Sequence, residues 1–497
     1  MLKNYTTLLV VLLLFSCEKK KEAIAAFTPT FTASDQTTHK IKADQEYTFG
    51  YLEVLENREK PEGNTIKLPV YIFKSRNKNP KKDPIIYTVG GPGSSTMRSA
   101  QYMKYYQYLD DRDFILFEQR GTQYAQPHLD CPEWSEAIYL SNLPEVTQKQ
   151  RDSLLENAVI KCKERLTAKG IDLNSYHTNA TAADIEDLRK TLNIETYNLL
   201  TISYSTKIAQ VLLRDYPKHI RSVVMDSPLP LEVNYDEESV GNLLEVVDNL
   251  LSACEADTAC AAKFPNLKNR FFQYMKDITE NPLQVEVTNP NTGKPATFSL
   301  KGEDIITVFT VTNSNNVGNV PFEIQKILNN DLSSVKAQLE SLLQQPTQFT
   351  GLGRGMRLSV WCAEEYPFVS QTIVAAEKTK YPEVKGLSPA VFESNICDIW
   401  NVKPLKAIEN EAVQSDVPVL FLSGEYDSDT PVKWAAQLQK NFPNSFHLTF
   451  KGWKHIVTAN WSHPCGMEVA NAFFNKPERK PNLPCFEAMQ ALQFKTE

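Results

Sequence analysis

The stretch NLLTISYSTKIAQ, residues 198–210, raises the question that decides the fold of this chain. A short apolar run with the composition of a strand ends at Ile202, Ser203 follows, and helical spacing begins soon after. A serine at a sharp strand-to-helix turn is the place of a catalytic nucleophile when glycines stand two residues before and two residues after it. Thr201 and Ser205 occupy those positions here. The stretch alone leaves Ser203 either a nucleophile on an altered turn or an ordinary helix cap.

Short apolar runs alternate with helical stretches through the first half of the chain. The runs that end in loops read DPIIYTVGGPG, DFILFEQRG, YNLLTIS and RSVVMDSP, and helical spacing lies between them around 145–168 and 180–192. This alternation predicts a mainly parallel sheet with helices on both faces. From about 231 to 413 the chain is mostly helical, after which VPVLFLSGEYD and FHLTFKGWKH resume the strand–loop pattern. We predict an α/β domain at 44–230 and 414–497, with a helical cap at 231–413 inserted at the sheet edge where ligands bind.

The N-terminus has the pattern of an export signal. Lys3 precedes an apolar run at 8–15, which is too short to span a bilayer. The run ends in LFSC, before EKKKE, and resembles a bacterial lipobox. On that resemblance residues 1–17 carry the lipoprotein signal, Cys17 becomes the lipidated first residue, and 18–43 form a flexible tether. We therefore expect a lipid-anchored protein of the bacterial cell envelope, with a plain signal peptide as the alternative.

The composition is that of a large globular chain. Its 497 residues are 42% hydrophobic, and a formal net charge of −7 offers no basic surface for nucleic acid. Eight further cysteines form an even set, as expected for disulfides in an oxidising compartment. Spacing alone leaves many pairings open, and proximity favours Cys131–Cys162, Cys254–Cys260, Cys362–Cys397 and Cys465–Cys485. No CxxC pair or Cys/His cluster indicates zinc, and we expect neither a metal nor an organic cofactor.

Three residues of the types needed for acyl transfer each follow a strand-like run. Ser203 follows YNLLTI, Asp427 follows VPVLFLSGEY and His455 follows FHLTFKGWK. A nucleophile, an orienting carboxylate and a base in this chain order can form a hydrolase triad. Glu425 and Asp429 lie beside Asp427 and fit turn or helix-cap roles.

Only one of the seven histidines combines a strand end, a glycine-containing approach and a place after the acid. That residue is His455. His128 and His177 lie in loops and stay weaker alternatives.

A glycine-rich loop supplies the other part of the chemistry. GGPG follows the run IIYTV, well upstream of Ser203. Its Gly91 and the residue after the serine, Tyr204, are the expected backbone donors for an oxyanion, because glycine lets the main chain approach a substrate carbonyl. Taken alone, GGPG could equally be a simple turn.

Several stretches resemble the proline iminopeptidase/tripeptidyl aminopeptidase branch of the α/β-hydrolases. They include YTVGGPGSS, FEQRGTQYAQPHLDCPE, ISYSTKIAQVLLRDYP, CEADTACAAKFPNL, LSVWCAEEYPF, LSGEYDSDTPVKWA and GWKHIVT, in family order from about 45 to 485. The resemblance implies an α/β-hydrolase fold with a mostly helical cap. It also implies that Ser203 is the nucleophile, Asp427 the acid, His455 the base, and Gly91 and Tyr204 the oxyanion donors.

The sequence departs from this family at several points. The sharp strand-to-helix turn that carries the serine is called the elbow, and Thr201 and Ser205 replace its usual glycines. Glu118 replaces the aspartate that usually begins the loop containing the arginine of EQRG, and Val89 stands where some members have histidine. A relaxed elbow in an inactive homologue is therefore an alternative.

The substrate class is predicted from the cap. Glu364 and Glu365 of WCAEE are candidates for holding a substrate's free α-amino group, because a carboxylate in a partly dry pocket suits an ammonium. Their alternative role is as solvated helix charges. We expect a serine aminopeptidase that acts on peptides. A carboxylesterase for small esters and a non-catalytic surface lipoprotein are the rivals, and the oligomeric state stays open.

Overall fold

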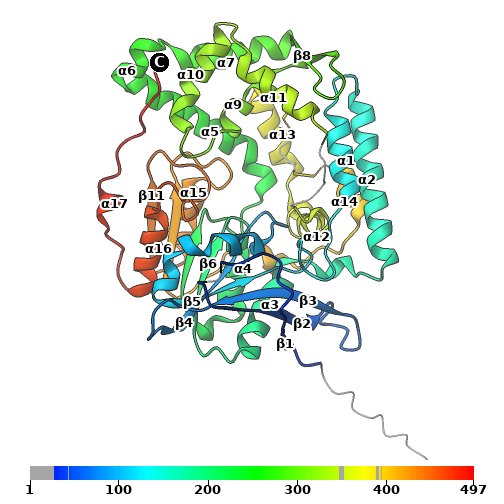
Figure 1. Ribbon diagram of the computed structural model, residues 1–497. Coiled ribbons are helices and arrows are strands. Elements are labelled where there is room, and N and C mark those ends of the chain that lie inside the picture. Colours follow the sequence, from blue (N-terminus) through cyan, green and yellow to red (C-terminus); the bar gives the residue numbers. More distant parts are fainter. Residues whose placement is uncertain (1–26, 43, 346–351, 388–390, 393) are drawn as a thin grey trace, which may run out of the picture.

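The computed structural model describes residues 27–42, 44–345, 352–387, 391–392 and 394–497 (Figure 1). Nine strands form one sheet in the order β1-β2-β3-β5-β4-β6-β7-β10-β11. The pairs β1–β2, β2–β3 and β3–β5 are antiparallel, and every other neighbouring pair is parallel. The bounds are β1 Thr30–Ala33, β2 Tyr47–Leu55, β3 Thr65–Phe73, β4 Lys81–Thr88, β5 Arg112–Phe117, β6 Tyr197–Ile202, β7 Ile220–Asp226, β10 Val419–Gly424 and β11 Ser445–Phe450.

The central strands are apolar because helices bury both of their faces. Strands β6 and β10 are buried at every position, as expected for the middle of a covered parallel sheet. Leu199 packs in a cluster with residues of α3, α4 and α15, whereas Leu200 packs on the opposite face with residues of α16. These helices span α3 Thr178–Thr191, α4 Ser205–Asp215, α15 Val432–Gln439 and α16 Cys465–Asn475. The predicted α/β-hydrolase architecture is confirmed.

Helices and one hairpin fill the chain between β7 and β10, and they have an apolar core of their own. Figure 1 shows this cap over one edge of the sheet. The hairpin pairs β8 Leu283–Thr288 with β9 Pro295–Leu300. The helices are α5 Tyr235–Ala256, α6 Thr258–Lys263, α7 Leu267–Glu280, α8 Gly302–Ile305, α9 Thr307–Thr310, α10 Val320–Leu328, α11 Ser333–Leu343, α12 Arg354–Glu364, α13 Gln371–Lys380 and α14 Ser394–Trp400.

Two long helices from the first α/β segment extend beside the cap (Figure 1). They are α1 Pro132–Ser141 and α2 Gln148–Ala168. The Lys163 ammonium on α2 donates to the Ile399 carbonyl on α14 at 2.8 Å. At the other end of the chain, the short helix α17 Pro484–Glu487 follows α16 and is joined to it by a disulfide between Cys465 and Cys485.

The four disulfides confirm the pairings expected from proximity: Cys131–Cys162, Cys254–Cys260, Cys362–Cys397 and Cys465–Cys485. The N-terminal tether needs one correction, since its residues Thr30–Ala33 form edge strand β1. This strand is formed by main-chain pairing with β2, and its side chains are mostly exposed. For that reason the sequence shows no apolar alternation here. Cys17 lies outside the described residues. Across the described ranges, none of the helices has the length and apolar character needed to cross a membrane.

Candidate active site

Ser203 occupies a strained turn between β6 and α4. Its φ is +58°, a left-handed conformation that is uncommon for residues other than glycine. The buried Ser205 hydroxyl accepts a hydrogen bond from the Ile202 N–H at 2.8 Å. The same hydroxyl lies 2.8 Å from the Thr88 carbonyl and 2.9 Å from the Ile202 carbonyl, both as acceptors. A serine in the place of glycine thus ties the turn to the end of β4.

The other replaced glycine also fits without opening the turn. Thr201 is fully buried, and its hydroxyl donates to the Val224 carbonyl on β7 at 3.3 Å. Its β-branched side chain lies at the end of a strand, a conformation that suits threonine. The glycine that the turn does require comes from the neighbouring loop. A Cβ on Gly90 would stand 2.7 Å from the Ser203 Cβ and 2.8 Å from the Tyr204 nitrogen, so only glycine allows this approach.

The predicted oxyanion donors lie together beside Ser203. Gly91 has a φ of +121°, which favours glycine, and it lines one cavity with Ser203 and Tyr204. Within the described part of the chain, the N–H groups of Gly91 and Tyr204 have no hydrogen-bond acceptor. Two backbone donors free to meet a developing oxyanion are what acyl transfer needs.

The loop after β5 supports this region. The buried Glu118 carboxylate accepts hydrogen bonds from the Ser95 hydroxyl at 3.0 Å and the Thr96 N–H at 2.8 Å, just beyond the glycine-rich loop. Two residues later, Arg120 forms a fully buried ion pair with Asp184 on α3. The glutamate in the place of the family's aspartate therefore still holds the glycine-rich segment.

His455 and Asp427 form the expected acid–base pair. Their Nδ1 and Oδ2 atoms lie 2.8 Å apart. Thr430 adds a contact that sequence reasoning missed, because its hydroxyl donates to Asp427 Oδ2 at 2.7 Å and lies 3.2 Å from His455 Nδ1. The Thr430 N–H also donates to Asp427, at 2.9 Å. The three-residue spacing from the acid was the available signal, since aspartate commonly accepts from the N–H groups that follow it.

Charge governs the protonation of this pair. Burial opposes ionisation of Asp427. The positive charge of His455, its hydrogen bond and the hydrogen bonds from Thr430 outweigh burial, so the pKa of Asp427 is lowered overall. Burial also opposes protonation of His455. The charge and hydrogen bond of Asp427, with the charges of Asp429 and Asp226, outweigh burial and raise the pKa of His455 to about 9. The imidazole is thus largely protonated at neutral pH before substrate binds.

A second buried carboxylate fixes the loop that carries His455. Asp226, at the end of β7, accepts from the Val457 N–H at 3.0 Å and the Thr458 N–H at 2.8 Å. Ile456 has a φ of +69°, which is a rare conformation for a β-branched residue. The Ser227 hydroxyl accepts from the Ile456 N–H at 2.9 Å. These contacts hold the strained loop and so set the position of the imidazole.

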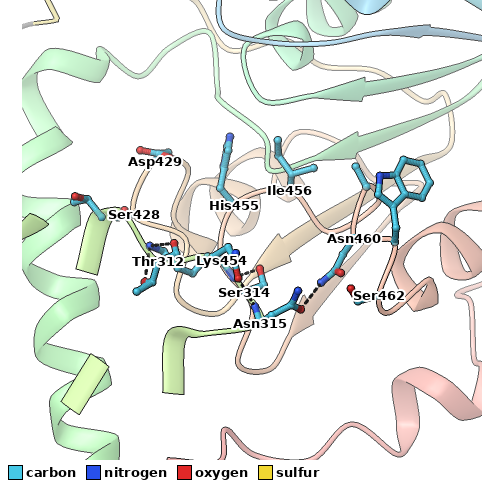
Figure 2. Close-up of a pocket in the computed structure, with 14 residues that line it drawn as sticks. Thr312, Ser314, Asn315, Ser428, Asp429, Lys454, His455, Ile456, Asn460 and Ser462 are labelled. Atoms are coloured by element: carbon cyan, nitrogen blue, oxygen red, sulfur yellow. Dashed lines mark hydrogen bonds between the residues drawn. The ribbon is translucent and has the colours of Figure 1, made fainter. Parts of the chain in front are cut away.

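Two adjoining cavities meet at His455. A cavity of about 410 Å³ contains Ser203, His455 and the oxyanion donors. A second, of about 540 Å³, is lined largely by Ser, Thr and Asn side chains between the cap and the loops after β10 and β11. Figure 2 shows His455 and Asp429 at the second cavity, with Ser314 and Asn315 nearby. His455 and Asp429 line both cavities, so the two spaces are contiguous at the imidazole.

Asp429 is the free carboxylate of the site. It is exposed toward the cavities, and no described residue donates a hydrogen bond to its carboxylate or forms an ion pair with it. One ligand atom from each of Asp427, Asp429 and His455 lies within 4.8 Å of the others, a grouping that could also hold a metal ion. Two of these three side chains already bond each other as an acid–base pair.

Glu364 and Glu365 need a correction as amine-binding residues. Glu364 is buried, and its carboxylate accepts from the Thr178 N–H and hydroxyl, both at 2.6 Å. Glu365 pairs with the buried Lys207 ammonium on α4. Neither glutamate lines the two cavities. Both carboxylates are bound by buried donors on α3 and α4 and are therefore turned away from the cavities. Residue order alone does not reveal these donors.

The weaker histidine alternatives lie outside both cavities. The His177 ring is the N-cap of α3, accepting from the Ala180 N–H at 3.3 Å, and burial lowers the pKa of His177 to about 4. His128 is exposed on a loop. Neither lines either cavity at Ser203 or His455.

The chain is similar to several known proteins. A family model described as alpha/beta hydrolase fold matches residues 83–459. Serine protease Hip1 of Mycobacterium tuberculosis is 21% identical over 431 residues, covering 82% of this chain and 81% of that protein. Tripeptidyl aminopeptidase of Streptomyces coelicolor is 27% identical over 189 residues, covering 36% of this chain and 34% of that protein. A solved proline iminopeptidase from Mycobacterium smegmatis has a TM-score of 0.39 at 13% identity, covering 83% of this chain and 96% of that chain.

Proposed function

The chain belongs to the alpha/beta hydrolase fold family and is a serine hydrolase, and on this premise we propose that it is an exported aminopeptidase that releases N-terminal residues or short peptides. One observation carries the choice of substrate. The unpaired Asp429 carboxylate faces the cavity that contains Ser203, where it can bind the ammonium of a free N-terminus.

The reaction follows from the positions of the side chains. The Ser203 hydroxyl attacks the peptide carbonyl carbon while neutral His455 takes its proton, and the N–H groups of Gly91 and Tyr204 receive the oxyanion. The C–N bond then breaks, and His455 gives the proton to the leaving amine. Asp427 holds the imidazole through Nδ1. Water, deprotonated by His455, attacks the acyl ester and releases the acid and the free serine.

The nucleophile is tested by replacing it. We expect Ser203→Ala to lower kcat/KM on aminoacyl and tripeptidyl arylamides by about 10⁴-fold or more, with an unchanged melting temperature. Wild-type protein should also be labelled covalently by a fluorophosphonate, whereas the variant should not. A variant as active as wild type would remove Ser203 from the mechanism.

The amine site is tested with paired substrates. For wild type we expect higher kcat/KM on N-terminally free arylamides than on their acetylated forms. Asp429→Asn should abolish that preference, while Asp416→Asn, which removes an exposed carboxylate outside both cavities, should keep it. Glu364→Gln should keep it as well. Equal cleavage of free and blocked substrates by wild type would instead indicate an esterase or an endopeptidase.

Export and anchoring rest on the leader and the disulfides. The lipobox-like LFSC and the four disulfides of the folded part support secretion to an oxidising compartment. We expect the protein in the membrane fraction of its cells and Cys17→Ser in the soluble fraction or as an unprocessed precursor. A wild-type protein found free of lipid would show that the leader is a plain signal peptide and that Cys17 is not lipidated.

A further inference from the structure

Arg357 is a cation inside the catalytic cavity. It lies on α12 of the cap and lines the same space as Ser203 and His455. Its Nη1 donates to the Gly91 carbonyl at 2.9 Å, and its guanidinium stacks over the Trp361 ring with 5.4 Å to the ring centroid. The guanidinium is therefore fixed beside the oxyanion loop.

This cation has no anionic partner among the described residues. Nε is buried without a hydrogen-bond acceptor, and across the described ranges no carboxylate forms an ion pair with Arg357. The charged and titratable groups that face it are Arg354, Asp236, Asp429 and Tyr235. Asp236 is already used by the Trp361 indole N–H at 3.1 Å and the Val391 N–H at 3.1 Å. Arg357 is partly buried, and a charge that is partly removed from water and left unpaired is costly, which points to a ligand that completes the site.

The charge of Arg357 persists at neutral pH. Burial, and then the neighbouring Arg354 charge, lower the pKa of Arg357 to about 10, which still leaves the guanidinium protonated. Arginine is also the side chain best suited to a carboxylate, since its planar fork can donate two parallel hydrogen bonds.

The position of Arg357 assigns it to the acyl half of the substrate. The leaving group departs toward His455, which protonates it, and the polar cavity continues on that side. Arg357 lies at the oxyanion loop, where the carbonyl that is attacked and the atoms attached to it must sit. A group bound by Arg357 thus stays on the enzyme after the first bond breaks.

We propose that Arg357 binds a carboxylate on the acyl part of the substrate, so that the enzyme prefers to cleave after an acidic residue. This deepens the proposed function in its single-residue form, because there the acyl residue also carries the ammonium assigned to Asp429. One cavity then offers a cation and an anion to a residue that bears both charges, such as N-terminal glutamate or aspartate.

The test is a selectivity ratio between substrates of equal size. We expect wild type to show a kcat/KM at least about 10-fold higher for Glu-arylamide than for Gln-arylamide, the size of a charge-assisted hydrogen bond. Arg357→Gln should bring that ratio to about one or below, and Arg357→Lys should keep part of it. Arg354→Gln, which removes a positive charge three residues earlier on the same helix and outside the cavity, should leave the ratio unchanged.

A second substrate pair separates this inference from the amine assignment. The α-aryl esters of N-acetyl-Glu and N-acetyl-Gln need no free amine, so their ratio should follow Arg357 even if the aminopeptidase proposal fails. Fluorophosphonate labelling of each variant reports an intact nucleophile. A wild-type ratio near one for both pairs overturns the inference. Equal losses on Glu and Gln substrates in Arg357→Gln overturn it too, since they would assign Arg357 only to holding the Gly91 carbonyl.

Discussion

At the scale of single residues, the elbow shows how a lost glycine is replaced by a hydrogen bond. Ser205 satisfies the Ile202 N–H and reaches the Thr88 carbonyl, so the substitution joins β6 and β4 rather than loosening the turn. The conformational freedom that the turn needs comes from Gly90 and from Ser203 itself, whose φ is positive. A motif defined by two glycines is thus kept in geometry without either of them.

We predict that Ser205→Ala lowers the free energy of unfolding by about 1–3 kcal/mol, because the buried Ile202 N–H loses its partner. Ser205→Gly should cost more than alanine, since it restores the family residue but adds backbone freedom. Urea denaturation measures both. Thr201→Val is the matched control, as it removes only a single 3.3 Å hydrogen bond and should cost less. A Ser205→Gly variant more stable than wild type would contradict this account.

The pH dependence belongs to His455 and its carboxylate neighbours. Only the neutral imidazole can act as the base, so kcat/KM should rise with pH through the pKa of about 9. Asp429→Asn removes a negative charge that favours the protonated ring. The pKa should then fall, and the rising limb should move to lower pH by roughly one unit. The profile is measured on a blocked ester, so that amine binding does not enter. An unshifted limb would show that Asp429 does not act on the imidazole.

At the scale of elements, a buried ion pair joins the cap to α4, the helix that follows the elbow. Lys207 on α4 is 2% exposed and Glu365, just after α12, is 4% exposed. Glu365 also accepts from the Tyr235 N–H at 3.2 Å, at the start of α5. Three elements that are distant in sequence therefore meet at one carboxylate, which explains why it is not available to a substrate.

We predict that Lys207→Met destabilises the protein by about 3–5 kcal/mol, because it leaves the Glu365 charge buried and unpaired. Adding Glu365→Gln should recover much of the loss, since the amide can still accept from the Tyr235 N–H. Denaturant unfolding at fixed pH provides the comparison. If the single variant loses under 1 kcal/mol, the pair does not connect the cap to the elbow as described.

Sequence patterns predicted the elements better than their contacts. The strand ends that carry Ser203, Asp427 and His455 follow from apolar runs and loops, because a covered parallel strand leaves a strong local signal. The edge strand at Thr30–Ala33 left none, since it depends on main-chain pairing. Thr430 is three residues from Asp427, which is a local signal, but its contact with the His455 ring depends on a histidine 25 residues later.

At the scale of the whole molecule, the cap and the sheet enclose two contiguous cavities of different character. The cavity at Ser203 contains Arg357 and Trp361, whereas the second cavity is lined largely by hydroxyls and amides. Trp461 lines this polar cavity, and its ring contacts those of Tyr102 and Tyr105, all three partly exposed. An extended chain that leaves past His455 would meet these rings.

We predict that Trp461→Ala lowers kcat/KM by about 10-fold for peptides with three or more residues beyond the cleaved bond, as expected for the loss of one well-packed aromatic contact. Short arylamides should be cleaved as by wild type, because their leaving group ends within the cavity. Ile408→Ala, which truncates an exposed apolar residue outside both cavities, serves as the control. An equal effect on long and short substrates would place Trp461 in the structure of the site rather than in substrate binding.

The sequence by itself determined the α/β-hydrolase fold, because alternating apolar runs and family motifs are local signatures. It also placed Ser203, Asp427 and His455 after strand-like runs in the chain order expected of a triad. Proximity along the chain favoured the four disulfide pairs that the structure contains. The tertiary structure alone decided which charges face the two cavities. Glu364 and Glu365 read as binding residues but are satisfied by Thr178 and Lys207 behind the elbow helix. Asp429 read as a turn residue, but it lines the cavity and no described residue donates to its carboxylate or forms an ion pair with it. Whether a charged side chain is free to bind depends on the neighbours that folding brings to it, and that information is not local to the chain.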